Sequence, residues 1–229
     1  MFREIFLFEL RYWLKQKTTY ISFGIFVLLS FAIAAASTGL FESMTATTDH
    51  GKSLINSPLA ILGFVSQLCQ YAYFVLPSII GASIYRDFQS NMHGIFFTLP
   101  VSKQGYLGGR FLGSFVITVF LFSGIAIGHL VALSMPWVNP DFLGPFSIAA
   151  YLHTYLFYVI PDLILFSALV FSVTMLSRNI SAGFILVIVL FLLNSLLGDF
   201  KPTSTINTWR DFWILTGQMP FRMSPSTGR

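Results

Sequence analysis

The stretch Thr18–Leu40, TTYISFGIFVLLSFAIAAASTGL, decides the fold because none of its 23 residues is charged. A helix of about 20 apolar residues is long enough to cross the hydrocarbon core of a bilayer. Four further predominantly apolar stretches follow, at about 58–84, 107–135, 148–175 and 181–197. We therefore predict an all-α membrane protein, a polytopic helical bundle with about five transmembrane helices within residues 18–198.

The composition supports a membrane protein and argues against a soluble one. Hydrophobic residues make up 55% of the 229 residues and charged residues only 10%, whereas a soluble domain carries about 25% charged residues. The formal net charge is +4, but the basic residues flank the apolar stretches, as topology signals do. They form no basic patch with interleaved aromatic residues, so we expect no nucleic-acid partner.

Residues 1–17 predict an amphipathic helix before the first span. Apolar residues recur on one face at spacings of three and four, and charged residues lie on the other. The apolar face holds Phe2, Phe6, Leu10, Trp13 and Leu14, and the charged face holds Glu4, Arg11 and Lys15. We expect this helix to lie in the headgroup layer with Trp13 as an anchor. The alternative is a simple charged flank of the first span.

The distribution of Lys and Arg predicts the topology. Four basic residues precede the first span, Arg86 and Lys103 lie between the second and third, and Arg178 lies between the fourth and fifth. The alternate loops carry only Lys52. The N-terminus is therefore expected in the cytoplasm. The tail, 199–229, is atypical, and we interpret it as disordered or as a truncated end.

A short cytoplasmic helix is predicted over residues 87–100, between the second and third spans. Its apolar stripe recurs at helical spacing and comprises Phe88, Met92, Ile95, Phe96 and Leu99. Asp87 can cap its start and Pro100 ends it. Two passive alternatives remain: the helix lies in the headgroups, or it packs under its own bundle.

Small residues predict where the spans pack closely or bend. In the third span, Gly109 and Gly113, and again Gly124 and Gly128, match the small-xxx-small pattern of close helix contacts. Late in the second span, Pro77 and Gly81 predict a kink.

Few ionisable residues occur inside the spans. They are Asp162, His129 and His153, and an intramembrane acid is a functional candidate. One hypothesis makes Asp162 a proton or cation acceptor. The other has Asp162 hydrogen-bonded to Ser or Thr neighbours, or capping a helix broken at Pro161. The histidines do not have the spacing of metal ligands.

The sequence predicts neither an enzyme nor a resident cofactor. No nucleophile, base and orienting group fall close together, so no catalytic residue is assigned. Gly51–Ser53 carries only the end of a P-loop, because Ala46 stands where the motif needs its first glycine. ATP hydrolysis would require a partner. The single cysteine, Cys69, lies in an apolar stretch, and we expect it to be buried and inert.

The order of elements and the segment 85–110 resemble the permeases of type-2 ABC exporters. The segment has Tyr85-Arg86-Asp87, then Gly94, then the run Thr98–Lys103 (TLPVSK), followed by Tyr106, Gly108 and Arg110. The family usually has a glutamate-rich Glu-Arg-Glu cluster where this chain has Asp87 beside Arg86. The opening FREIFLFELRY also resembles the front end of long bacterial permeases fused to a zinc aminopeptidase, although no His-Glu-x-x-His helix occurs here.

The resemblance implies a permease subunit in the bacterial inner membrane, surrounded by lipid. It would pair with a second permease copy and with an ABC ATPase subunit that binds ATP. The loop helix 88–99 would dock on the ATPase and couple its closure to substrate export. The implied coupling residues are Arg86, Asp87, Phe88, Met92, Ile95, Phe96, Leu99 and Lys103. Two other hypotheses remain, a secondary carrier or channel that uses Asp162 and a truncated, non-functional permease fragment.

Overall fold

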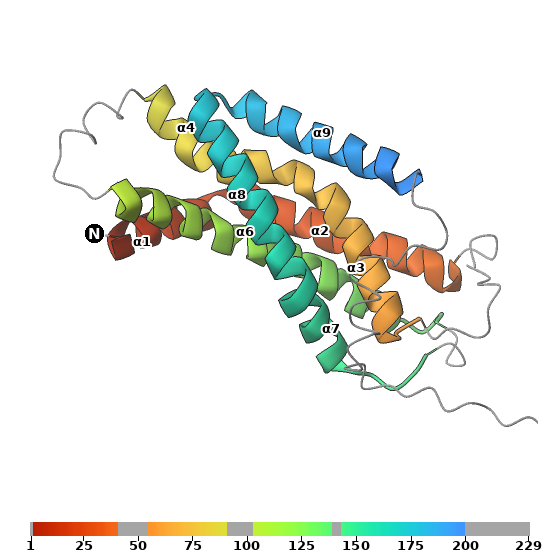
Figure 1. Ribbon diagram of the computed structural model, residues 1–229. Helices are drawn as coiled ribbons and strands as arrows, with labels where there is room; N and C mark the ends of the chain where they lie inside the picture. Colours follow the sequence, from red (N-terminus) through yellow and green to blue (C-terminus); the bar gives the residue numbers. More distant parts are fainter. Residues whose placement is uncertain (1, 41–54, 91–102, 139–142, 200–229) are drawn as a thin grey trace, which may run out of the picture. The chain divides into compact units, whose positions relative to one another are not determined.

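The computed structural model describes residues 2–40, 55–90, 103–138 and 143–199. These residues form helices joined by short connections and contain no strand, which confirms the predicted all-α bundle. The chain divides into two compact units, Met1–Val189 and Leu190–Arg229. The first unit holds every helix from α1 to α8 and the beginning of α9 (Figure 1).

Among the described residues, four helical stretches are long and apolar enough to cross a membrane: Lys17–Thr38, Pro58–Gln89, Gln104–Leu133 and Ile148–Ser177. They coincide with the first four predicted spans. The fifth predicted span corresponds to α9, Ile180–Asp199, whose apolar part Ile180–Asn194 is shorter. Four helices therefore support the assignment of this chain as a membrane protein.

The N-terminal region contains two helices separated by a sharp break. The first is α1, Phe2–Lys15, and the second is α2, Lys17–Ala35, which continues as a π-helical turn over Ala36–Leu40. Gln16 between them has extended backbone angles. The Thr19 hydroxyl donates to the Trp13 carbonyl oxygen at 2.8 Å and satisfies one carbonyl at the end of α1. The predicted N-terminal helix is present; its place in the headgroup layer stays a prediction.

The second span is a helix with an irregular middle. It begins at α3, Pro58–Ala72, where the Ser57 hydroxyl accepts a hydrogen bond from the Ala60 amide. A 3₁₀ turn (Tyr73–Val75) and a π-helical turn (Pro77–Gly81) follow before α4, Ala82–Gln89. Proline lacks an N–H group and clashes with the preceding turn, so a regular helix cannot pass through Pro77. The predicted irregularity at this proline is confirmed.

The third span, α6 (Lys103–Leu133), packs against both N-terminal helices, with α1 along its first part and α2 along the rest (Figure 1). The two predicted glycine pairs make these contacts. A Cβ atom on Gly109 or Gly113 would meet α1, and one on Gly124 or Gly128 would meet α2. The closest approach is at Gly128, where a Cβ would lie 2.3 Å from the Val27 carbonyl oxygen. The small-xxx-small prediction is confirmed.

The fourth span comprises α7 (Ile148–Thr154), a π-helical turn (Tyr155–Val159) and α8 (Ile160–Ser177). Arg178 ends α8 in a left-handed conformation with φ 53°. The Asn179 side-chain oxygen then accepts from the Ser181 amide at 2.9 Å, which caps the first turn of α9. The core of the first unit lies between the second, third and fourth spans and includes Leu76, Ile80, Ile117, Leu121 and Leu163.

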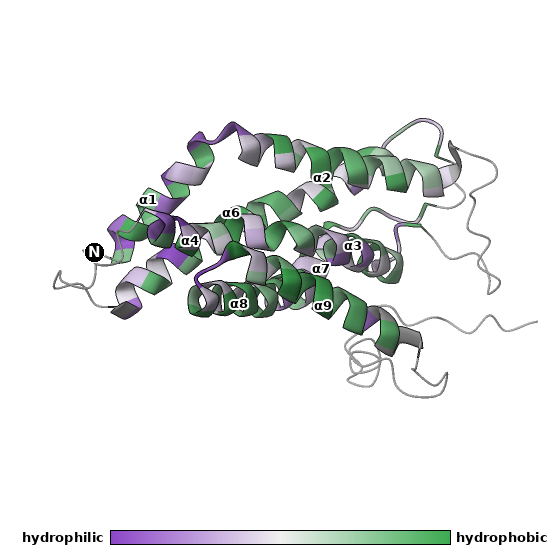
Figure 2. Cartoon of the chain, turned by 90° about the horizontal axis from the view of Figure 1, so that it is seen from above, coloured by the Kyte–Doolittle hydropathy of each residue, from purple (hydrophilic) through white to green (hydrophobic). Residues whose placement is uncertain are grey.

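Large apolar side chains also cover the outside of the spans. On α2, Ile21, Ile25 and Leu28 are each more than half exposed, as are Leu152 and Leu156 in the fourth span. Figure 2 shows hydrophobic residues along α2, α6 and α8, with hydrophilic residues gathered at α1 and α4. Such an exterior suits lipid and is rare on a soluble protein, whose exposed apolar patches are small.

The Gly128 contact yields a stability prediction. Gly128→Ala would place a methyl group against backbone atoms of α2, which cannot yield as a flexible side chain would. We expect the free energy of unfolding in detergent to fall by about 1–3 kcal/mol. Gly24→Ala on α2 is the control, because a Cβ there meets nothing within 4 Å. Equal stability of the two variants would contradict the close α2–α6 contact.

Candidate functional site

A cluster of charged side chains is buried where α1, α4 and α6 meet. Its centre is Glu9 on α1, which has no exposed surface. Arg86 and Asp87 come from the end of α4, and Arg110 comes from the first turns of α6. The second and third spans thus bring their charged ends to the same carboxylate. We call Glu9, Arg86, Asp87 and Arg110 the charge cluster.

The Glu9 carboxylate pairs with both arginines of the charge cluster. Its Oε1 accepts hydrogen bonds from Arg86 Nη2 and from the Trp13 indole nitrogen, the latter at 2.9 Å. Its Oε2 accepts from Arg110 Nη1. Arg110 and Arg86 lie 101 and 77 residues away in sequence. One buried side chain therefore joins three helices.

Asp87 completes the charge cluster from the α4 side. Its Oδ1 accepts from Arg110 Nη2 at 2.5 Å, and its Oδ2 accepts from the Tyr106 hydroxyl. Arg110 therefore bridges the two carboxylates. Two acids and two arginines balance in charge, which is needed because an unpaired buried charge costs several kcal/mol.

Aromatic rings enclose the two guanidinium groups. The Arg86 Cζ lies 3.7 Å from the centroid of the Tyr12 ring, close enough for a cation–π contact. The Arg110 Cζ lies 5.7 Å from the Tyr106 centroid and 5.8 Å from that of Phe8. The pair of Glu9 with Arg110 is buried, so it is stronger than an exposed pair.

The glycines of α6 make room for the cluster. A Cβ on Gly113 would lie 2.7 Å from Glu9 Cβ, and one on Gly109 would lie 3.1 Å from Ile5 Cβ. Any larger residue at Gly113 would push α1 outward and lengthen the contacts of Glu9. The glycine pair therefore sets the distance at which Glu9 reaches Arg110.

The charge cluster is a closed network of ion pairs and hydrogen bonds. The carboxylates are held by fixed donors, and within the described ranges no group of three or more His, Cys, Asp or Glu residues is placed to hold a metal ion. The segment that follows α4 starts from a helix end fixed to two other helices.

The predicted coupling residues divide into three groups. Arg86 and Asp87 lie in the charge cluster, and Phe88 lies beside it, with the Arg178 Cζ 5.7 Å from its ring centroid. Lys103 is the first residue of α6. The remaining four, with Pro100, lie outside the described residues: Met92, Ile95, Phe96 and Leu99.

The prediction that Asp87 caps a new helix is wrong. Asp87 lies within α4, which continues the second span to Gln89 and ends at Ser90. Its carboxylate accepts from Tyr106 and Arg110 instead of from backbone amides. Ion pairing across the bundle outweighs the local preference of aspartate for a cap, because charge-assisted hydrogen bonds are the stronger ones.

The predicted intramembrane polar residues do not form one site. Asp162 Oδ2 accepts from the Tyr73 hydroxyl of the second span, a donor that none of the hypotheses for Asp162 named. His129 Nδ1 lies 2.7 Å from the Tyr151 hydroxyl. His153 stacks on Phe157 with ring centroids 5.3 Å apart. Each residue thus has separate partners. Cys69 is buried, as predicted.

Sequence reasoning missed Glu9, the centre of the cluster. A signal for it exists, because Glu9 follows Phe6 by three residues and precedes Trp13 by four. It therefore lies within the apolar face of α1 and not on the charged face. A carboxylate on a buried face needs partners. Its partners come from residues far along the chain and are not readable from local spacing.

Comparisons with known proteins add no family to this geometry. No protein-family model matches the chain, and no curated protein or solved structure matches it.

The charge cluster predicts a large effect of one substitution. Glu9→Gln leaves the buried Arg110 and the partly exposed Arg86 with one carboxylate, and removing one partner of a buried pair typically costs about 3–5 kcal/mol. We expect a loss of that order in detergent-based unfolding. Glu4→Gln makes the same change at an exposed position of α1, where ion pairs contribute about 0–1 kcal/mol. If both variants unfold alike, the Glu9 contacts are not structural.

Proposed function

We propose that this chain is the membrane-spanning permease subunit of an ATP-driven exporter of the type-2 ABC kind. The single observation that carries the proposal is the ion pairing that joins the end of the second span to α1 and to the start of the third span. Arg86 and Asp87, near the end of α4, form ion pairs with Glu9 and Arg110.

An exporter of this kind needs a lever between its ATPase and its membrane spans, and the ion pairs support such a role for the segment between α4 and α6. An ATPase outside the membrane can move the spans only through a segment that is rigidly connected to them. The two ends of the segment 91–102 are α4 and α6, and Asp87–Arg110 pairs these ends directly. Arg86–Glu9 adds α1. A force on the loop would therefore reach three helices together.

Two further features support the proposal. The run Thr98–Lys103 and the residues Tyr106, Gly108 and Arg110 resemble the family at this loop, and the order of elements predicted from the sequence resembles the family's layout. Four spanning helices are few for a pathway. We therefore include a second permease copy, with the ATP bound by partner ATPase subunits in the cytoplasm of a bacterium.

A secondary carrier is the second candidate, and one observation favours it. Asp162 is a carboxylate inside the fourth span that is hydrogen-bonded to a neutral tyrosine. Such an acid is a possible proton or ion acceptor. The two candidates differ in energy source, because a carrier works without an ATPase.

The coupling role is tested by affinity purification of the tagged chain from its native membrane. We expect an ATPase with P-loop motifs to copurify, and Phe96→Glu to abolish this association by placing a charge on the apolar stripe. Phe146→Glu is the matched control, because Phe146 is 68% exposed and lies before α7, on the predicted external side. Retention of the ATPase by Phe96→Glu would exclude coupling through this stripe. Ion-driven flux by the chain alone, lost in Asp162→Asn, would favour the carrier.

A further inference from the structure

The outer side of α1 carries basic residues that take no part in the charge cluster. Arg11 and Lys15 are four residues apart on one side of the helix, and both are exposed. Lys17, the first residue of α2, is exposed as well. Within the described ranges none of the three forms an ion pair, and the nearest acid along the chain, Glu9, is bonded inside the charge cluster. We call Arg11, Lys15 and Lys17 the basic surface.

The contacts of α1 with α6 determine which side of α1 faces outward. Cβ atoms on Gly109 and Gly113 would meet side chains of α1, including Glu9. Trp13 is buried, and its indole nitrogen donates to the Glu9 carboxylate. Arg11 follows Glu9 by two residues, which is about 200° around a helix. The side of α1 that holds Glu9 and Trp13 therefore packs inside the protein, and the basic surface is on the side that remains open.

The helix lengths relate this surface to the membrane boundary. α6 has 31 residues and is about 46 Å long, whereas the hydrocarbon core of a bilayer is about 30 Å thick. α1 contacts the first part of α6, and α2 contacts the later part. The first span begins at Lys17. Because Arg11 and Lys15 precede Lys17 within two helical turns, they lie next to the lipid headgroups when the span crosses the bilayer.

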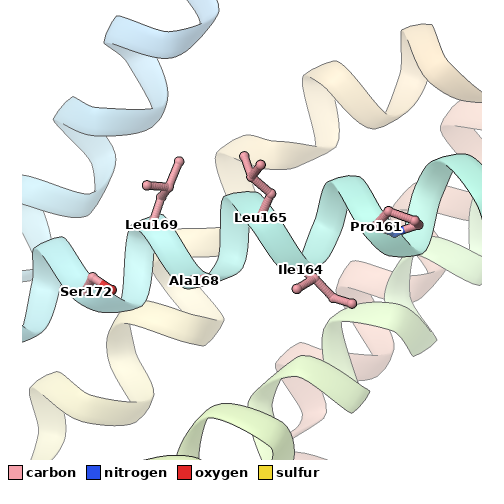
Figure 3. Close-up of a pocket in the computed structure, with 6 residues that line it drawn as sticks. All are labelled: Pro161, Ile164, Leu165, Ala168, Leu169 and Ser172. Carbon is pink, nitrogen blue, oxygen red and sulfur yellow. The ribbon is translucent and has the colours of Figure 1, made fainter. Parts of the chain in front are cut away.

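The exposed side of α8 shows the contrasting surface of a span. Leu165 and Leu169 project outward from this helix (Figure 3). No residue that lines this side carries a charge: Pro161, Ile164, Leu165, Ala168, Leu169 and Ser172. Such a side suits acyl chains but offers nothing to a charged headgroup. The basic surface at the start of the first span provides that second kind of lipid contact.

We propose that the basic surface binds the headgroups of anionic phospholipids in preference to zwitterionic ones. Charge complementarity selects this partner, because a zwitterionic headgroup carries its own cation and an anionic one does not. A guanidinium such as that of Arg11 can donate two parallel hydrogen bonds to one phosphate. Phe8 and Leu14 flank Arg11 on the same side of α1 and are 59% and 39% exposed, so they can contact the apolar part of the same lipid. The inference does not rest on the proposed function.

The test is native mass spectrometry of the full-length chain in detergent, which resolves individual bound lipids. The probes are dioleoyl phosphatidylglycerol and dioleoyl phosphatidylcholine, which differ in headgroup charge and share their acyl chains. Each basic residue near an anionic lipid surface contributes about fivefold in affinity. We expect the first phosphatidylglycerol to bind at least about twentyfold more tightly than phosphatidylcholine. The double variant Arg11→Gln, Lys15→Gln should lose about tenfold or more of this preference.

Single variants separate the basic surface from the general effect of net charge. Lys15→Gln should reduce the preference about fivefold, and Lys15→Arg should retain it. Arg178→Gln is the matched control, because it removes one charge from an exposed residue at the turn between α8 and α9. An unchanged unfolding temperature of each variant shows that the fold persists. Equal binding of the two lipids, an unchanged preference in the double variant, or an equal loss in Arg178→Gln would each overturn the inference.

Discussion

The burial of one carboxylate, Glu9, is the constraint on which the first unit depends. A carboxylate without exposed surface must be matched by positive charge, and both matching groups come from other helices. The ion pairs therefore fix the position of α1 against the ends of the second and third spans. Hydrophobic packing alone would not do this, because apolar faces slide past each other with little penalty in lipid.

The glycines of α6 allow α1 and α2 to approach it closely, and the approach of α1 allows the ion pairs of Glu9 to form. Gly109 and Gly113 bring α1 close enough for Glu9 to reach Arg110, and Gly128 brings α2 to backbone contact. Ion pairs and close packing thus act on different parts of α6: the ion pairs near its start, and the contacts of Gly128 further along the helix. The ion pairs select the register at the polar end, and the glycines supply van der Waals contact along the apolar part.

The spans could be predicted because apolarity is a local property of the sequence. The predicted boundary at Pro58 agrees with the start of α3, and the one at Ile148 with α7. The glycine contacts were also predictable, since the pattern lies within one helix. The partners of Glu9 and Asp162 were not, because they depend on which helices become neighbours. The expected cap at Asp87 failed for the same reason: a distant arginine outweighed the local signal.

The sequence separation within the charge cluster has a consequence for how the protein is made. Glu9 leaves the ribosome 77 residues ahead of Arg86 and 101 residues ahead of Arg110. Until both arginines have been synthesised, the Glu9 carboxylate lacks these partners and is most stable in water. The ion pairs of Glu9 therefore cannot all form before residue 110 has been synthesised, so the docking of α1 is completed only after the second span and the start of the third have been made.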